Sequence, residues 1–172
     1  MTFSDYWGVA SGFIQVTTGE GELLYQTAKL LPPHSLIVEI GTLKGGTAYL
    51  LGKSRRRVYT IDNYSESGSN IGEATANLKS LRNVHLLVGT SEEIAKTWKQ
   101  PIDLLFVDGS HLYEMVILDL NSWLPLVKQG GFVVFHDFMS HWGTTVAVSE
   151  AVGARLLKKI KIEGSMLVCQ KL

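Results

Sequence analysis

The sequence lacks several features, and each absence excludes a class of protein. A single cysteine, Cys169, leaves no internal disulfide in the 172-residue chain. No apolar run approaches the ~18 residues that a membrane-spanning helix needs. The N-terminal residues also lack the basic segment and apolar core of a secretory signal. We therefore expect a cytoplasmic protein with no membrane partner.

Net charge is absent too, because 16 basic residues balance 16 acidic residues. A neutral chain has no bulk electrostatic attraction to nucleic acid, so no nucleic-acid partner is expected. In contrast, 45% of the residues are apolar, which favours a folded core over disorder. We expect one domain over residues 1–172, with an N-terminal helical or lid segment at 1–35 and a core at 36–172.

Short apolar runs alternate with helical patterns along the chain. The runs DLLFVD and GFVVFHD are continuously apolar, which is typical of strands buried on both faces of a parallel sheet. The last two runs are separated only by a three-residue turn, which predicts a hairpin and one antiparallel strand. We predict strands at 36–41, 58–62, 84–88, 103–108, 131–136, 156–162 and 166–170, and helices at 20–31, 46–53, 71–81, 91–98, 112–124 and 144–152.

Acidic residues stand at the ends of three predicted strands, namely Asp62, Asp108 and Asp137. Ligands of open α/β sheets bind outside the carboxyl ends of the strands. Histidines lie close to two of these acids, at His111 and His136, so turn formation alone does not account for the set. We expect a functional site at this edge of the sheet.

The first predicted strand leads into the glycine-rich segment VEIGTLKGGTAYLLG. A dinucleotide fingerprint would need glycine where Leu43 stands, which disfavours an NAD-dependent oxidoreductase. Inside the strand, Glu39 needs a partner, either a ligand ammonium group or the backbone of the glycine loop. Asp62 stands 21 residues after Gly41, the spacing of an acid that accepts ribose hydroxyls. The alternative for Asp62 is an Asx turn with Asn63.

Five segments in order, EIGTLKGGT, YTIDNY, VGTSEE, LLFVDGSH and KQGGFVVFHD, resemble class I S-adenosylmethionine-dependent methyltransferases. The sequence is most similar to the small-molecule O-methyltransferase branch, which contains catechol and caffeoyl-CoA methyltransferases. Macrolide and sugar methyltransferases and cephalosporin-hydroxylase-like proteins form a related grouping. The resemblance implies an α/β fold, a Rossmann-like three-layer sandwich with a seven-stranded, mostly parallel sheet. Many class I members have glycine in place of Leu43, but the catechol-type branch also lacks it.

The resemblance further implies S-adenosylmethionine as cofactor and a small-molecule acceptor as substrate. The loop from Glu39 to Thr47 would hold the methionine end, Asp62 the ribose, and Thr90 with Ser91 the adenine. Asp108 would face the sulfonium. The candidate cofactor-binding residues are Glu39, Gly41, Thr42, Gly45, Thr47, Asp62, Asn63, Thr90, Ser91 and Asp108.

A divalent cation is the second implied group. Catechol-type enzymes bind Mg²⁺ through acids after strands four and five, where this sequence has Asp108 and the pair His136-Asp137. Carboxylates suit Mg²⁺, whereas the histidine shifts the preference toward Mn²⁺, Fe²⁺ or Zn²⁺. The expected cation is Mg²⁺ or Mn²⁺. The alternative is that the acids position cofactor and substrate without a metal.

The catalytic candidates are His111 and Asp108. Catechol-type enzymes carry a lysine base three residues after the strand-four acid, and His111 occupies that position here. Histidine can take a hydroxyl proton near neutral pH. The alternative is that His111 caps the following helix or bonds Asp108.

Two other functions stay open at this point. The first is a metal-dependent hydrolase or hydroxylase-like protein using Asp108, His111, His136 and Asp137, which would leave the glycine loop without a purpose. The second is a cofactor-binding protein without catalysis. Since the chain is close to the minimum for this fold, we expect a small acceptor or a partner subunit that completes the site. A homodimer is compatible with the apolar composition.

Overall fold

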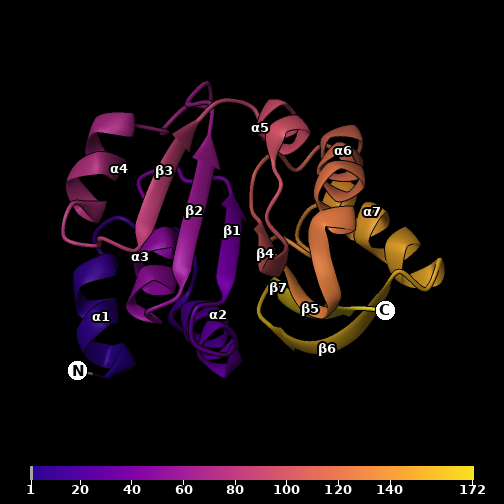
Figure 1. Cartoon of the computed structure of the whole chain (residues 1–172), viewed down its shortest axis with the longest axis horizontal. Coiled ribbons are helices and arrows are strands. Elements are labelled where there is room, and N and C mark those ends of the chain that lie inside the picture. Colours follow the sequence, from indigo (N-terminus) through magenta and orange to yellow (C-terminus); the bar gives the residue numbers. More distant parts are fainter. Residues whose placement is uncertain (1) are drawn as a thin grey trace.

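A computed structural model of the chain describes residues 2–172 (Figure 1). The strands are Leu36–Ile40 (β1), Arg57–Asp62 (β2), Val84–Val88 (β3), Ile102–Val107 (β4), Val127–Phe135 (β5), Leu157–Glu163 (β6) and Met166–Lys171 (β7). The helices are Phe3–Ala10 (α1), Thr18–Leu30 (α2), Gly46–Lys53 (α3), Ile71–Leu78 (α4), Ser91–Thr97 (α5), Tyr113–Trp123 (α6) and Trp142–Gly153 (α7). A short 3-10 helix, Leu124–Leu126, follows α6.

All seven strands form one sheet in the order β3-β2-β1-β4-β5-β7-β6. Neighbours from β3 to β5 are parallel, and β7 is antiparallel to both β5 and β6. The predicted α/β fold class and its single antiparallel strand are confirmed. In Figure 1 the N-terminal half of the chain lies at the left and the C-terminal half at the right. No helix within residues 2–172 is both long enough and apolar enough to cross a membrane.

Two elements differ from the predictions. Strand β5 begins at Val127 rather than residue 131, because the pairing of β5 with β4 shifts register between Ile102 and Leu104. Helix α1 was not among the predicted helices. Helix α5 begins at Ser91 as predicted, and its N-cap Thr90 forms a reciprocal capping box with Glu93.

Alternate residues of the strands face two apolar layers. Leu36, Val38 and Ile40 of β1 belong to the core beneath α6 and α7. Ile37, between them, belongs to the core beneath α2 and α3. Because side chains alternate along a strand, Glu39 shares the α2 and α3 face with Ile37. Helix α2, which lies within residues 1–35, is part of this core. It stays a prediction that residues 1–35 form a helical or lid segment with its own role.

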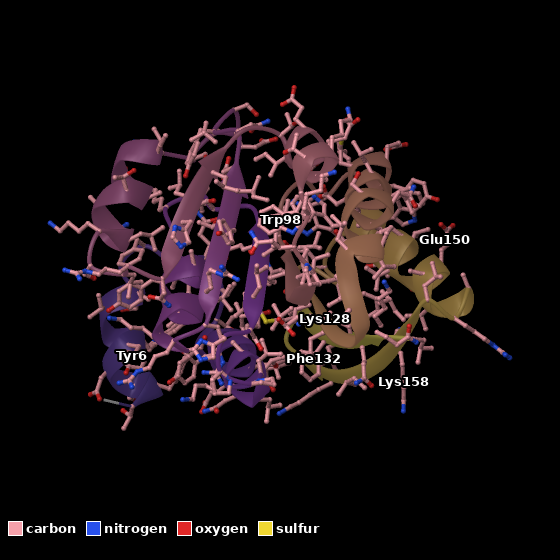
Figure 2. All side chains as sticks on the ribbon, in the orientation of Figure 1. Tyr6, Trp98, Lys128, Phe132, Glu150 and Lys158 are labelled. Carbon is pink, nitrogen blue, oxygen red and sulfur yellow. The ribbon has the colours of Figure 1, made fainter. Side chains whose placement is uncertain are left out.

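Aromatic rings join α5 to the sheet and to α6. Trp98, labelled near the middle of Figure 2, lies edge-on to Tyr59 at 5.0 Å and to Trp123 at 5.5 Å between ring centroids. Trp123 is fully buried in α6. These contacts fix the C-terminal end of α5 against β2 and α6.

Two glycines allow loops at the carboxyl edge to meet. Gly41, at φ +96°, lies where a Cβ atom would come within 2.0 Å of the carbonyl oxygen of Asp108. Gly143, in the first turn of α7, lies where a Cβ would come within 2.3 Å of the His111 carbonyl oxygen and 2.5 Å of the Tyr113 nitrogen. These contacts bring the loop after β1 and the start of α7 against the loop after β4.

We predict that Gly143→Ala destabilises the protein, because the added methyl group meets backbone atoms that cannot rotate away. The expected loss in the free energy of unfolding is about 1–3 kcal/mol, the range for overpacked sites. Gly153→Ala in the same helix is the control, since a Cβ there has no neighbour within 4 Å. It should raise stability by about 0.5–1 kcal/mol through helix propensity. Urea unfolding measures both, and equal stabilities of the two variants would contradict the prediction.

Candidate active site

The carboxyl edge of the sheet gathers a cluster of histidines and carboxylates. Asp108 follows β4, and His136 with Asp137 follows β5. His111 comes from the loop before α6, and His141 is the N-cap residue of α7. The prediction that Asp108, His111, His136 and Asp137 share one edge agrees with this geometry. Asp62 makes a separate set of contacts in the glycine loop.

His136 lies between three carboxylates. Its Nδ1 is 3.1 Å from Asp108 Oδ1 and 3.1 Å from Asp137 Oδ2, while its Nε2 is 3.5 Å from Glu20 Oε2. Burial by itself would lower the pKa of His136, but the hydrogen bonds to Asp108 and Asp137 outweigh burial and raise it to about 10. Without a cation, these carboxylates favour the charged imidazolium form of His136, and binding of a cation would require release of a ring proton.

Asp137 is the centre of the cluster. Its backbone is left-handed, at φ +58°, a conformation that costs energy in a non-glycine residue and is held by its surroundings. Oδ2 lies 2.7 Å from His111 Nε2, and Oδ1 lies 3.2 Å from His141 Nδ1. Hydrogen bonds from His111 and His136 hold the pKa of Asp137 well below its usual range. The hydrogen bond to Asp137 in turn raises the pKa of His111.

The cluster has a donor set that a divalent cation could use. Ligand atoms of Asp108, His136 and Asp137 all lie within 4.8 Å of one another, as do those of His111, Asp137 and His141. Two ligand atoms that bind one ion at about 2.0–2.2 Å lie about 3 Å from each other. The distances between histidine nitrogens and carboxylate oxygens in this cluster are close to that value. Mixed imidazole and carboxylate donors favour Mn²⁺, Fe²⁺ or Zn²⁺ over Mg²⁺. The residues fit such an ion, and they also satisfy one another by hydrogen bonds.

Glu39 has no such partners. The residue is fully buried, and within residues 2–172 neither carboxylate oxygen has a hydrogen-bond partner. Burial raises the pKa of Glu39 to about 8, an effect that the nearby hydroxyls of Thr47 and Thr60 only partly offset. A buried carboxylate without a partner is costly, which indicates that a ligand supplies the missing donor.

Asp62 holds the glycine loop in place. The backbone N–H groups of Thr42 and Leu43 donate to Oδ2 at 3.0 and 2.8 Å, and the N–H of Tyr64 donates to Oδ1 at 2.7 Å. The alternative of an Asx turn is therefore present, with Tyr64 as its donor. Binding of the ribose by Asp62 stays a prediction. The Tyr64 hydroxyl is buried and has no hydrogen-bond partner within residues 2–172, and burial raises its pKa to about 12.

The other predicted cofactor residues form the loop around these carboxylates. Gly45, at φ +84°, is the N-cap of α3. The hydroxyl groups of Thr42 and Thr60 are 2.6 Å apart, and Thr47 is buried. Asn63 is exposed, and its Oδ1 accepts hydrogen bonds from Ser65. Their contacts with a cofactor stay predictions.

Two residues of this edge were missed in the sequence. Glu20 caps α2 together with Thr17, and its Oε1 also accepts hydrogen bonds from the backbone and hydroxyl of Ser165 at 2.7 and 2.8 Å. Burial alone would raise the pKa of Glu20, but hydrogen bonds from Thr17 and Ser165 lower it to about 2. The Thr17-x-x-Glu20 spacing signals the helix start but says nothing of His136 or Ser165.

The second missed residue is Asp119, a buried carboxylate of α6 that accepts a hydrogen bond from the Ser91 hydroxyl. The sequence does hold a signal for it. Asp119 adjoins the apolar stripe of Val116, Leu120 and Trp123, where a charged residue is unexpected in a helix that packs on a sheet.

Comparisons with known proteins agree with this geometry. A family model described as a methyltransferase domain matches residues 38–138. The uncharacterized protein R132 of Acanthamoeba polyphaga mimivirus is 32% identical over 120 residues, which are 63% of this chain and 54% of that protein. The chain thus spans about half the length of this curated relative.

Solved structures share the fold at low sequence identity. The O-methyltransferase NovP has a TM-score of 0.75 at 20% identity, over 91% of this chain and 81% of its own. The S-adenosylhomocysteine-bound methyltransferase PaMTH1 of Podospora anserina has a TM-score of 0.75 at 15% identity, over 98% and 86%. The matched residues run from within β1 to just beyond β5 and include the glycine loop, Asp108, His111, His136 and Asp137. The chain therefore belongs to the methyltransferase domain family and has the fold of class I S-adenosylmethionine-dependent methyltransferases.

Proposed function

We propose that this methyltransferase transfers the methyl group of S-adenosylmethionine to a hydroxyl oxygen of a small molecule. The observation that carries the proposal is the 2.7 Å contact between His111 and Asp137 beside Asp108. An oxygen acceptor must lose its proton as it is methylated, so the site needs a base near the reacting centre. A hydrolase reaction would use the base but leave the glycine loop without a role.

His111 is the proposed base. Asp137 contacts Nε2, so it favours the tautomer with the proton on Nε2 and leaves Nδ1 to accept the acceptor's proton. The same carboxylate stabilises the imidazolium that forms, which agrees with the raised pKa of His111. Stacking on His141, at 4.2 Å between ring centroids, restrains the His111 ring.

Glu39 and the glycine loop are the proposed cofactor site. S-adenosylmethionine supplies an electrophilic methyl group on a sulfonium centre when it is bound. The unpartnered carboxylate of Glu39 fits the ammonium group at the methionine end of that molecule. Asp62 keeps the loop backbone in a set shape through the N–H groups of Thr42 and Leu43.

A divalent cation at Asp108, His136 and Asp137 is part of the proposal. Such an ion would supply Lewis acidity that lowers the pKa of the acceptor hydroxyl. Asp108 would also help to position the acceptor: its side chain is partly buried, and its hydrogen bond with His136 opposes the rise in its pKa that burial causes.

Apolar side chains flank the proposed base. Leu112, Met139 and Trp142 are 66%, 73% and 74% exposed. Their loops are joined through the contact of Gly143 with His111. Large exposed apolar groups beside a reaction centre support a small acceptor with an apolar or aromatic body. A second copy of the chain over this flank is the alternative.

We predict that S-adenosylhomocysteine binds the protein at micromolar concentration and that Glu39→Gln weakens binding about 10- to 100-fold, through loss of a charged hydrogen bond. Isothermal titration calorimetry measures both dissociation constants. Glu22→Gln, at an exposed position of α2, is the matched control and should bind like the wild type. No binding by the wild type at ~100 μM ligand would overturn the proposed function.

We predict that the cofactor-free protein loses stability as pH rises from about 5 to 8. The pKa of Glu39 is 4.5 in the unfolded chain and about 8 in the folded one, so the folded state binds more protons across this range. Raising the pH therefore favours unfolding. Urea unfolding at both ends of the range should show a smaller loss in Glu39→Gln, because glutamine does not ionise. Equal losses in the two proteins would contradict the buried Glu39.

We predict that His111→Ala lowers kcat for methyl transfer about 10²- to 10⁴-fold, the usual contribution of a general base. Transfer is followed with a panel of catechols and sugars. The dissociation constant of S-adenosylhomocysteine should stay unchanged. The control is His34→Asn, because His34 is exposed, precedes β1 at the opposite edge and has a left-handed backbone that asparagine tolerates.

If the His111→Ala variant keeps the wild-type kcat, His111 is not the base. Each assay is run with and without EDTA. Activity that is unchanged by EDTA would show that the reaction needs no divalent cation, and it would not contradict the proposed role of His111.

A further inference from the structure

Asp119 is a buried carboxylate whose position the described chain does not explain. It is 4% exposed, and the other inward positions of α6, Val116, Leu120 and Trp123, are apolar. Its one hydrogen bond within residues 2–172 comes from the hydroxyl of Ser91 to Oδ1. Burial raises the pKa of Asp119 to about 6, which Ser91 only partly offsets. A carboxylate that is buried with a single neutral partner is unfavourable unless something else binds it.

The free oxygen of Asp119 faces the loops at the carboxyl edge. A Cβ atom placed on Gly109, the residue after Asp108, would lie 3.9 Å from Asp119 Oδ2. Gly109 in turn lies against Gly41, whose added Cβ would be 3.1 Å from the Gly109 nitrogen. Ser91 comes from the loop after β3. Asp119 therefore lies beside the point where the loops after β1, β3 and β4 meet.

Oδ2 also remains open. Within residues 2–172, the carboxylate oxygens that are both sealed from solvent and without a partner are those of Glu39. Oδ2 of Asp119 accepts no hydrogen bond there either, and it is not among these fully buried atoms. It has free capacity to accept a hydrogen bond from a ligand.

Glu39 and Asp119 lie on opposite faces of the sheet. Glu39 shares the face of β1 that packs on α2 and α3, whereas α6 covers the other face. The site thus offers two carboxylates with free acceptor capacity, one on each side of the contact between Gly41 and Asp108. S-adenosylmethionine carries nitrogen donors at its two ends, an ammonium group and the exocyclic amino group of adenine. Glu39 fits the ammonium group. The other nitrogen donor, the amino group of adenine, is therefore left for Asp119.

We propose that Asp119 recognises the adenine of the cofactor by accepting a hydrogen bond from its exocyclic amino group on Oδ2. Ser91 takes part indirectly, because its proton is directed to Oδ1 and its oxygen is left as a further acceptor beside the base. Asp119 is therefore a residue that determines nucleobase specificity and has no part in the methyl transfer step. The inference rests on the proposed function, since it needs S-adenosylmethionine as the ligand.

The test compares two ligands that differ in one group. S-adenosylhomocysteine is titrated by calorimetry against its analogue in which the 6-amino group of the base is replaced by hydrogen. The wild type should bind S-adenosylhomocysteine about 10- to 100-fold more tightly, because the analogue leaves a buried carboxylate unpaired. In Asp119→Ala the two dissociation constants should become nearly equal, mainly through weaker binding of S-adenosylhomocysteine.

Two further variants separate recognition from a structural role. Asp119→Asn keeps the shape of the side chain and should reduce the preference, because a neutral oxygen is a weaker acceptor. Glu92→Gln, an exposed change beside Ser91, should leave the preference as in the wild type. This control excludes a general effect of negative charge on α5.

Some results would overturn the inference. Equal binding of both ligands by the wild type would overturn the role of Asp119. It would leave S-adenosylmethionine as the proposed cofactor. Equal weakening of both ligands in the folded Asp119 variants would show that Asp119 only joins α6 to α5. Failure of the wild type to bind either ligand would overturn the proposed function as well, and it would be seen before any variant is made.

Discussion

The close approach of Gly41 to the carbonyl oxygen of Asp108 is the contact on which both parts of the site depend. Strands β1 and β4 are parallel neighbours, so their loops leave the sheet at the same edge. Only a residue without a Cβ can stand where Gly41 stands. The contact brings the loop that follows Glu39 and β1 against the loop that carries Asp108. The proposed cofactor site and the proposed reaction centre therefore adjoin each other.

The carboxylates of this edge fall into two groups by what they touch. Asp108 and Asp137 are hydrogen-bonded to histidines, and Asp137 is ionised far below its ordinary pKa. Glu39 and Asp119 are buried with few partners, and burial raises the pKa of each. The first group suits proton transfer and cation binding, because histidines contact both of its carboxylates. The second group suits ligand donors, because a bound ammonium or amino group would relieve an existing cost.

Much of the fold could be predicted because the signals are local. Continuous apolar runs such as DLLFVD and GFVVFHD indicated buried parallel strands, and the strand-end acids indicated the edge where we propose the site. The start of β5 could not be predicted, because the pairing of Val127 with Ile102 depends on an irregularity in the neighbouring strand. The contact of Glu20 with Ser165 joins residues 145 positions apart, and no pattern in either segment announces it.

By itself, the sequence determined the order of strands and helices, the antiparallel end of the sheet and the acids and histidines that follow the strands. These depend on periodicity and on residue types at strand ends, which one segment of chain displays alone. Only the tertiary structure decided what each of these groups touches. It showed that Asp62 binds the backbone of the glycine loop and that Asp137 lies between three histidines. It also showed that, within residues 2–172, Glu39 has no hydrogen-bond partner and Asp119 has one, Ser91. The reason is that hydrogen bonding and burial depend on atoms from distant segments, which meet only when the sheet and its helices have packed.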